Sequence, residues 1–196
     1  MAGLPCVIVR LSGCDLSCSY CDTGYAKDEG EDMTVRSVVD TVGKTGIRRA
    51  LVTGGEPLQQ EGSVTLMNAL LNAGFEVVLE TNGAVDISVV PHNVHIVMDL
   101  KTPGSGCDTR NLLENLDLLK ESDEIKIVLT GREDYLWARE MIEEHDLTGR
   151  FAVTLSPVHG ELDPARLAAW ILEDRLEAAL GIQLHKYIFG ADKRRV

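Results

Sequence analysis

The chain has 196 residues, 44% of them hydrophobic and 26% charged, which fits one compact domain over residues 1–196 with a sizeable core. Its formal net charge of −12 argues against nucleic acid as a partner, because such binding rests largely on neutralising phosphates. The sequence has no apolar run long enough to span a bilayer, and its first residues lack the pattern of a signal peptide. We therefore expect no membrane association and a cytoplasmic location.

Short β-branched runs alternate with longer amphipathic stretches along the chain. The pattern predicts strands at 6–11, 49–53, 75–80, 94–100, 124–129, 151–155 and 182–184. It predicts helices at 34–45, 61–73, 111–120, 133–145 and 164–176. This alternation is typical of parallel crossover units, and about six strands indicate a partial parallel β/α barrel of the α/β class. The site of such a barrel lies at the C-terminal mouth of its strands.

Three cysteines with the spacing Cys-x3-Cys-x2-Cys follow the first predicted strand: Cys14, Cys18 and Cys21. Three thiolates can hold a 4Fe-4S cluster by three corners and leave the fourth iron open for a substrate or cofactor. From the cysteines alone, a zinc site completed by Cys6, Cys107 or a histidine is the alternative. An odd number of cysteines, three of them clustered, is a poor disulfide framework and suits a reducing compartment.

A Gly-Gly-Glu-Pro segment, at Gly54, Gly55, Glu56 and Pro57, follows the second predicted strand. Glycines without side chains let backbone polar groups approach a ligand closely, and Glu56 adds a carboxylate at the same place. The alternative is an ordinary turn, since Gly and Pro mark turns. Its position one αβ unit after the cysteine loop favours a binding role.

Two further strands end in polar pairs. Glu80 and Asn82 are two residues apart, as are Asp99 and Lys101, so each pair shares a face of extended chain and can point into the barrel. A carboxylate suits ribose hydroxyls and an ammonium suits a carboxylate ligand. An Asp–Lys ion pair at a strand end is the alternative for the second pair. Ser156 follows the sixth predicted strand and is either a further contact or a turn residue.

The cysteine spacing resembles the cluster loop of the radical S-adenosylmethionine (SAM) enzymes, in which an aromatic residue, here Tyr20, usually precedes the last cysteine. The resemblance implies a 4Fe-4S cluster with one open iron on Cys14, Cys18 and Cys21. In these enzymes the Gly-Gly-Glu-Pro segment grips the methionine amino end of SAM. The implied SAM site comprises Gly54, Gly55, Glu56, Glu80, Asn82, Asp99, Lys101 and Ser156.

Longer segments resemble one family, the 7-carboxy-7-deazaguanine synthases of the queuosine and deazapurine pathway. They are residues 10–14, 21–25, 53–58, 80–83 and 183–187, within a similarity that runs from about residue 3 to the C-terminus. The resemblance implies the conversion of 6-carboxy-5,6,7,8-tetrahydropterin to 7-carboxy-7-deazaguanine with loss of ammonia. A 5′-deoxyadenosyl radical, formed from SAM, would take the hydrogen from C6 of the substrate.

The same resemblance implies further ligands. It places Mg²⁺ between the substrate carboxylate and Thr23, which agrees with the few protein oxygens that this ion needs. It implies substrate contacts from Arg10, Thr53, His185 and the carboxylate of Val196, a flavodoxin-like electron donor and a homodimer. A helix cap at Thr23 and a solvent-facing Arg10 are the alternatives.

Two features leave alternatives open. Family members usually carry a Glu-x-Phe-x-Ser-x-Gln-Gly-Glu-Gly stretch before the first strand, and this sequence starts where that stretch should just have ended. We expect that the natural protein starts further upstream than this sequence. The alternative is that another segment of the chain recognises the pterin. A glycyl-radical-enzyme activating enzyme, which shares Cys-x3-Cys-x2-Cys and Asp-x-Lys, is the alternative function. The Cys-Asp-Thr and His-Lys-Tyr segments at 21–23 and 185–187 favour the synthase.

Overall fold

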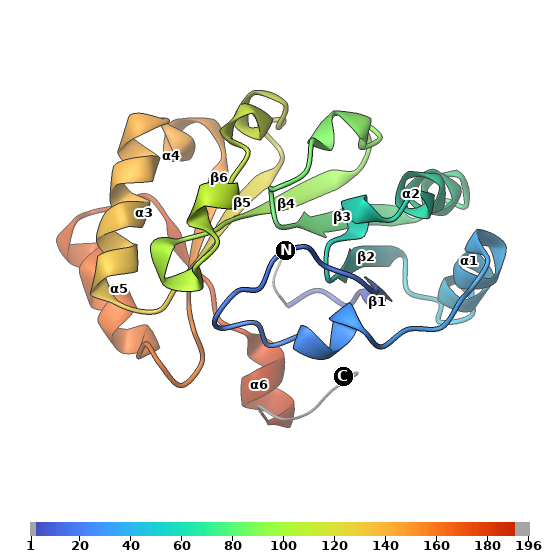
Figure 1. The fold of residues 1–196 in the computed structure, drawn as a ribbon, viewed down its shortest axis with the longest axis horizontal. Coiled ribbons are helices and arrows are strands. Elements are labelled where there is room, and N and C mark those ends of the chain that lie inside the picture. Colours follow the sequence, from blue (N-terminus) through green and yellow to red (C-terminus); the bar gives the residue numbers. More distant parts are fainter. Residues whose placement is uncertain (1–2, 191–196) are drawn as a thin grey trace.

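The computed structural model describes residues 3–190, which form one parallel sheet with its strands in sequence order. The seven strands are β1 (Val7–Leu11), β2 (Arg49–Gly54), β3 (Glu76–Thr81), β4 (His95–Leu100), β5 (Glu124–Leu129), β6 (Ala152–Pro157) and β7 (Ala179–Leu180). The sheet curves but does not close, because β1 and β7 lie at its two edges (Figure 1). The predicted partial β/α barrel is confirmed, with a seventh strand of only two residues.

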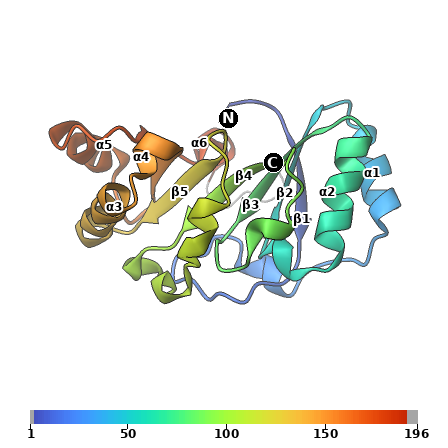
Figure 2. The ribbon, with the colours of Figure 1, turned by 90° about the horizontal axis from the view of Figure 1, so that it is seen from above.

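Helices cover the outer face of the curved sheet (Figures 1 and 2). They are α1 (Val35–Gly43), α2 (Gly62–Asn72), α3 (Arg132–Glu144), α4 (Leu147–Arg150) and α5 (Pro164–Glu173), whereas α6 (Leu184–Phe189) lies apart from this layer. The Thr34 hydroxyl caps α1 by accepting from the Ser37 amide at 3.2 Å, and Gly74, at a φ of 86°, follows the end of α2. Within residues 3–190, the helices are all too short or too polar to cross a membrane.

The hydrophobic core lies between the sheet and the helices, in two clusters. One gathers β1 to β3 with α1 and α2, around residues such as Val52 and Leu79. The other gathers β4 to β6 with α3 and α5, around Ile125, Ile127 and Leu129. Because side chains alternate along a strand, the intervening residues of each strand face the opposite, inner side of the half barrel. Polar side chains on that inner side are therefore separated from the core.

Two predicted elements are wrong. The segment predicted as a helix at 111–120 contains only short 3₁₀ turns, Asp108–Arg110 and Leu113–Asp117. The Asn111 side chain bonds to both the amide and the carbonyl of Lys101, and Asn115 bonds to the backbone of the loop after β3. These long-range bonds fix the segment in place of a regular helix.

The strand predicted at 182–184 is also absent from the described residues, because the last strand is β7 and the chain then enters α6. The amide of Gly181 donates to the Leu155 carbonyl at 2.8 Å, and this bond ends the pairing with β6. The helix predicted to reach residue 176 ends at Glu173, shortly before Arg175 takes up a φ of 50°. That left-handed conformation cannot continue a helix.

Candidate functional site

Polar side chains from neighbouring strands form rows on the inner face of the half barrel. The strand register sets Arg10 beside Thr53, and Asp99 beside Lys126. The Thr53 hydroxyl donates to Oε2 of Glu80 at 2.9 Å, which joins β2 to β3. These residues alternate with the core residues of the same strands, so they line the concave side together.

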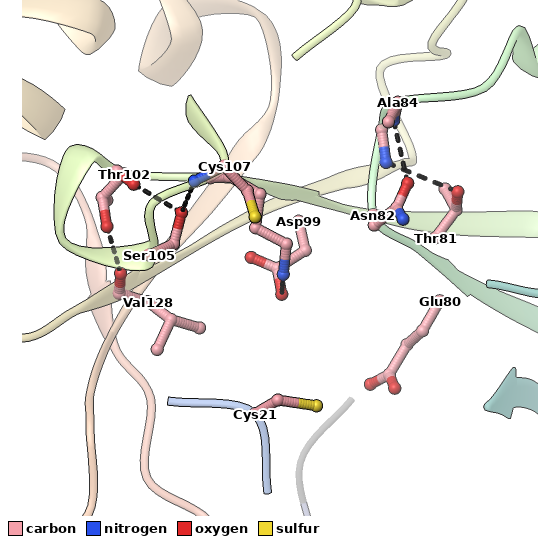
Figure 3. A network of polar contacts seen from close by, with 12 residues as sticks. Cys21, Glu80, Thr81, Asn82, Ala84, Asp99, Thr102, Ser105, Cys107 and Val128 are labelled. Atoms are coloured by element: carbon pink, nitrogen blue, oxygen red, sulfur yellow. Dashed lines mark hydrogen bonds and ion pairs between the residues drawn. The ribbon is translucent and has the colours of Figure 1, made fainter. Parts of the chain in front are cut away.

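The cysteine loop, residues 12–23, leaves β1 and crosses the mouth of this face. Figure 3 shows the Cys21 sulfur directed towards the space that Glu80 and Asp99 face from the sheet. Residues from the N-terminal loop and from two central strands therefore surround one space. This agrees with the expected place of a site at the C-terminal ends of parallel strands.

The start of the cysteine loop rests directly on the loop after β2. The amide of Gly55 donates to the Leu11 carbonyl at 3.0 Å, and the amide of Glu56 donates to the Gly13 carbonyl at 2.7 Å. A Cβ atom at Gly55 would overlap the Gly13 carbonyl oxygen and would lie 2.9 Å from the Cβ of Cys14. Only glycine allows this approach, so the Gly-Gly pair positions the first cysteine.

The middle of the cysteine loop is held by the loop after β4. The Ser19 amide donates to the Ser105 carbonyl at 3.0 Å, and the Ser19 hydroxyl donates to the Gly104 carbonyl at 2.7 Å. This docking brings the Cys18 thiol near the Cys107 thiol. The pKa of the Cys18 thiol is raised to about 11, mainly by burial. The nearby ammonium of Lys101 lowers this pKa, whereas the Cys107 thiol raises it further.

All three predicted cluster cysteines carry free thiols on this loop. Nδ2 of Asn82 lies 4.0 Å from the Cys14 sulfur, and the Thr23 hydroxyl lies 3.9 Å from the Cys21 sulfur. In the part of the chain that the structure describes, no three Cys, His, Asp or Glu side chains are gathered tightly enough to hold a metal ion. The thiols therefore have to turn inwards to share a cluster.

The donor set nevertheless fits a 4Fe-4S cluster with one open iron. Thiolates are the usual ligands of iron–sulfur clusters, and this loop offers three of them within eight residues. Its backbone is fixed at Gly13 and at Ser19, on either side of the first two cysteines.

Glu56 is fully buried, with 0% of its surface exposed, and its carboxylate bonds to the protein. It accepts from the amide of Leu58 at 3.0 Å, the hydroxyl of Thr81 at 2.8 Å and the amide of Asn82 at 2.6 Å. Burial raises the pKa of this carboxyl group, and the three hydrogen bonds oppose the rise. Glu56 therefore ties the loop after β2 to the loop after β3.

Asp99 and Lys101 form the ion pair that the sequence allowed as an alternative. Nζ of Lys101 lies 2.9 Å from Oδ2 of Asp99, and only 8% of Lys101 is exposed. Burial lowers the pKa of Lys101, but Asp99 outweighs this effect and the pKa is raised. Oδ1 of Asp99 is buried and has no hydrogen-bond partner among residues 3–190. A buried acceptor without a donor indicates a place for a ligand hydroxyl or water.

The C-terminal helix α6 is fastened to the cysteine loop through Asp22. Oδ2 of Asp22 accepts from Nε2 of Gln183 at 2.7 Å and lies 3.1 Å from Nζ of Lys186. Burial acts to raise the pKa of Asp22, but the hydrogen bonds from Gln183 and Lys186 and the charge of Lys186 hold it below its usual range. The residue between Cys21 and Thr23 therefore links the two ends of the sequence.

The structure brings together most, but not all, of the predicted site residues. Ser156 lies at the mouth end of β6 and is mostly buried, beside Gly181. His185 is exposed on α6, in the turn that approaches the cysteine loop through Lys186. Val196 lies outside the described residues.

Sequence reasoning missed Asp22 and Lys126, and it considered Cys107 only as a ligand of the alternative zinc site. Lys126 could have been found, because polar residues alternate with Ile125, Ile127 and Leu129 along β5, so that its side chain faces the inner side. The contacts of Asp22 and Cys107 depend on loops and carry no comparable signal in the sequence.

Comparison with known proteins gives consistent results. Residues 8–131 match the sequence profile of the Radical SAM superfamily. The chain is 42% identical over 198 residues to the 7-carboxy-7-deazaguanine synthase of Chlorobaculum tepidum, an alignment that covers 100% of this chain and 90% of the relative. It is 39% identical over 189 residues to the enzyme of that name from Methanospirillum hungatei, with 95% of this chain and 78% of the relative covered.

Among solved structures, Streptococcus suis SuiB bound to S-adenosylmethionine is similar with a TM-score of 0.65 and 15% identity, over 95% of this chain and 53% of SuiB. SuiB bound to its precursor peptide SuiA gives a TM-score of 0.66 and 14% identity, over 92% of this chain and 49% of that one. The chain spans about half the length of these structures. At this identity the likeness concerns the fold alone.

Proposed function

The chain belongs to the radical SAM superfamily and, within it, to the 7-carboxy-7-deazaguanine synthases, and we propose that it is the lyase that makes 7-carboxy-7-deazaguanine from 6-carboxy-5,6,7,8-tetrahydropterin. The pterin ring contracts and one nitrogen leaves as ammonia, so the atoms balance without another reactant. The observation that carries the proposal is the identity of 42% over the whole chain to a synthase of this name.

The cysteine loop would hold the 4Fe-4S cluster through Cys14, Cys18 and Cys21, and the open iron would face SAM. When bound, the cluster and SAM supply the radical that takes a hydrogen atom from C6 of the substrate. The protein fixes the loop at Gly13 and Ser19, which limits how far the three thiols can move. This supports a site that is ordered before its cofactors arrive.

SAM would lie along the mouth of β2 to β4. Backbone groups of Gly54 and Gly55 and the side chain of Asn82 are close to Cys14 and would meet its amino-acid end. The free Oδ1 of Asp99 suits a ribose hydroxyl, and the ammonium of Lys101 suits the SAM carboxylate. Glu56 would act as a positioning residue for Asn82, and Glu80 and Ser156 would border the same ligand.

The substrate would occupy the inner face of the half barrel. Arg10 and Thr53 are neighbours there, and the guanidinium fork suits a carboxylate or the pterin ring. We assign the Thr23 hydroxyl to Mg²⁺, which would also bind the substrate carboxylate. His185 is a further candidate contact from α6.

The proposal includes the cellular setting. The reaction would serve queuosine biosynthesis in the cytoplasm, with a flavodoxin-like protein as the electron donor. A homodimer would suit the open sheet, because the edges at β1 and β7 present unpaired backbone groups. Size-exclusion chromatography with light scattering tests the dimer directly.

The function is tested by anaerobic turnover. The protein is reconstituted with iron and sulfide, then given dithionite, SAM, Mg²⁺ and 6-carboxy-5,6,7,8-tetrahydropterin, and the products are followed by mass spectrometry. We expect 7-carboxy-7-deazaguanine and ammonia in equal amounts. The Cys18→Ala variant should lose iron and activity, since two thiolates cannot hold the cluster. Formation of 5′-deoxyadenosine without the deazaguanine product would keep the radical chemistry and reject the synthase.

A further inference from the structure

Lys126 lies on the inner face beside Asp99 and has no role in the function proposed above. Its strand β5 sends Ile125 and Ile127 into the core, so Lys126 points to the opposite side. The register sets it between Asp99 on β4 and Thr154 on β6. The side chain therefore belongs to the same row as the polar residues that border the proposed SAM site.

The ammonium of Lys126 is surrounded by carboxylates but is not bonded to any of them. Burial lowers the pKa of Lys126, and the charges of Asp99, Glu80 and Asp22 outweigh this effect, so the pKa is raised and the group stays charged. Across residues 3–190 it makes neither a salt bridge nor a hydrogen bond. It is a partly buried cation whose charge is balanced by carboxylates at longer range.

Each of the surrounding carboxylates already has another partner. Asp99 pairs with Lys101 at 2.9 Å, and Asp22 pairs with Lys186 at 3.1 Å. Glu80 accepts the hydroxyl of Thr53. A partly buried charge without a direct partner costs free energy, and a ligand of opposite charge lowers that cost. Lys126 is therefore a preformed position for an anionic group.

We propose that Lys126 binds the carboxylate of the substrate and so fixes the orientation of the pterin in the half barrel. The inference rests on the proposed function, in which the substrate carries one carboxylate. The competing carboxylate is that of SAM. Its amino-acid end is assigned to the loop after β2 and to Lys101. The substrate carboxylate is assigned to the Mg²⁺ at Thr23, which is next in sequence to Asp22, one of the carboxylates whose charge acts on Lys126.

The test compares two pterins that differ only in the carboxylate. Binding of 6-carboxypterin and of pterin is measured anaerobically by fluorescence quenching, on reconstituted enzyme with SAM. The variants are Lys126→Met and Lys126→Gln, which remove the charge, and Lys126→Arg, which keeps it. Lys44→Met is the matched control, because Lys44 is exposed after the end of α1. Thermal unfolding and iron content are compared for all variants.

We expect Lys126→Met and Lys126→Gln to weaken binding of 6-carboxypterin by about 10- to 100-fold, the worth of one charge-assisted hydrogen bond. Binding of pterin and of SAM should change by less than about twofold, within the scatter of a neutral substitution. Lys126→Arg should recover part of the loss, and Lys44→Met should match the wild type.

Equal weakening of both pterins, or weakening of SAM alone, would overturn the assignment to the substrate carboxylate. So would 6-carboxypterin binding that is unchanged in both charge-removing variants. None of these results would contradict the proposed function. That proposal is tested separately, and it fails if the wild-type enzyme does not convert the tetrahydropterin.

Discussion

The amide of Asn82 donates to Oε2 of Glu56 at 2.6 Å, and this bond joins the loops after β2 and β3 through a carboxylate that solvent does not reach. The other oxygen, Oε1, accepts from Leu58 and Thr81. One side chain therefore satisfies three donors and places Asn82 beside Cys14. Glu56, a residue of the predicted SAM motif, therefore holds two loops of the proposed SAM site together.

Substitution of Glu56 by Gln should destabilise the protein by about 1–3 kcal/mol, because the amide NH₂ of Gln cannot accept the buried N–H of Asn82. Urea unfolding measures the loss. The raised pKa of Glu56 sets the sign of the pH effect: its contribution is most favourable below the pKa of the unfolded chain and is lost as the pH rises through the folded pKa. This dependence should disappear in the variant. Unchanged stability with weaker SAM binding would instead indicate direct contact with SAM.

Substitution of Gly55 by Ala should displace the cysteine loop, because the new Cβ would overlap the Gly13 carbonyl and press on Cys14. We expect iron content after anaerobic reconstitution to fall well below that of the wild type. Gly62→Ala is the matched control, since nothing lies within 4 Å of a Cβ there and the residue begins α2. That variant should bind iron normally and gain up to about 1 kcal/mol of stability. Full iron content in Gly55→Ala would contradict the close approach.

Asp22→Asn should loosen α6 by removing the ion pair with Lys186. The Asp22 side chain is 41% exposed and the interaction is screened by solvent, so the expected cost is about 0.5–1 kcal/mol. Hydrogen exchange of the α6 amides measures it. Because the folded pKa of Asp22 is lowered, its contribution is present above the unfolded value, about 3.9, and is lost as the pH falls through the folded pKa. Acid sensitivity of α6 that persists in the Asn variant would reject this tie.

Cys107→Ala should let the Cys18 thiol ionise at lower pH. Burial, the main cause of its raised pKa of about 11, remains in the variant, but the contribution of the Cys107 thiol is gone. Alkylation of Cys18 in the cluster-free chain should become about fivefold faster at a fixed pH below that pKa, as expected for ~1 kcal/mol. Cys6→Ala serves as the control and should leave the rate unchanged. A rate that does not respond to Cys107 would show that the two thiols do not interact.

Thr23→Ala should leave iron content and reductive SAM cleavage largely intact while lowering the apparent Mg²⁺ affinity of pterin turnover about tenfold. Thr23→Ser keeps the hydroxyl that lies 3.9 Å from the Cys21 sulfur and should behave like the wild type. The measurement is product formation as a function of Mg²⁺ concentration. A Mg²⁺ response identical in the Ala variant and the wild type would remove Thr23 from the proposed metal site.

The sheet could be predicted because each strand is a short β-branched run that precedes an amphipathic stretch, as in 49–53 and 124–129. The helix expected at 111–120 could not be excluded from the sequence, because Asn111 and Asn115 bond to backbone groups that only the folded chain brings near them. In this segment the long-range hydrogen bonds outweigh the local preference for a helix.

The site divides in a similar way. Strand periodicity was enough to place Glu80 and Asp99 on the inner face, and it would have placed Lys126 there as well. Glu56 follows a strand inside a loop, where periodicity ends, so the sequence could not tell whether its carboxylate meets a ligand or the backbone. The contact between Cys18 and Cys107 depends on how two loops dock at Ser19.

The tie between Asp22 and Gln183 joins residues 161 positions apart in the sequence. A ribosome releases the cysteine loop early and α6 among the last elements, so on the nascent chain Asp22 has to wait for most of translation before it finds its partner. During that interval the cysteine loop is not fastened to α6. Messages that stop before codon 183 would yield chains in which this fastening never forms.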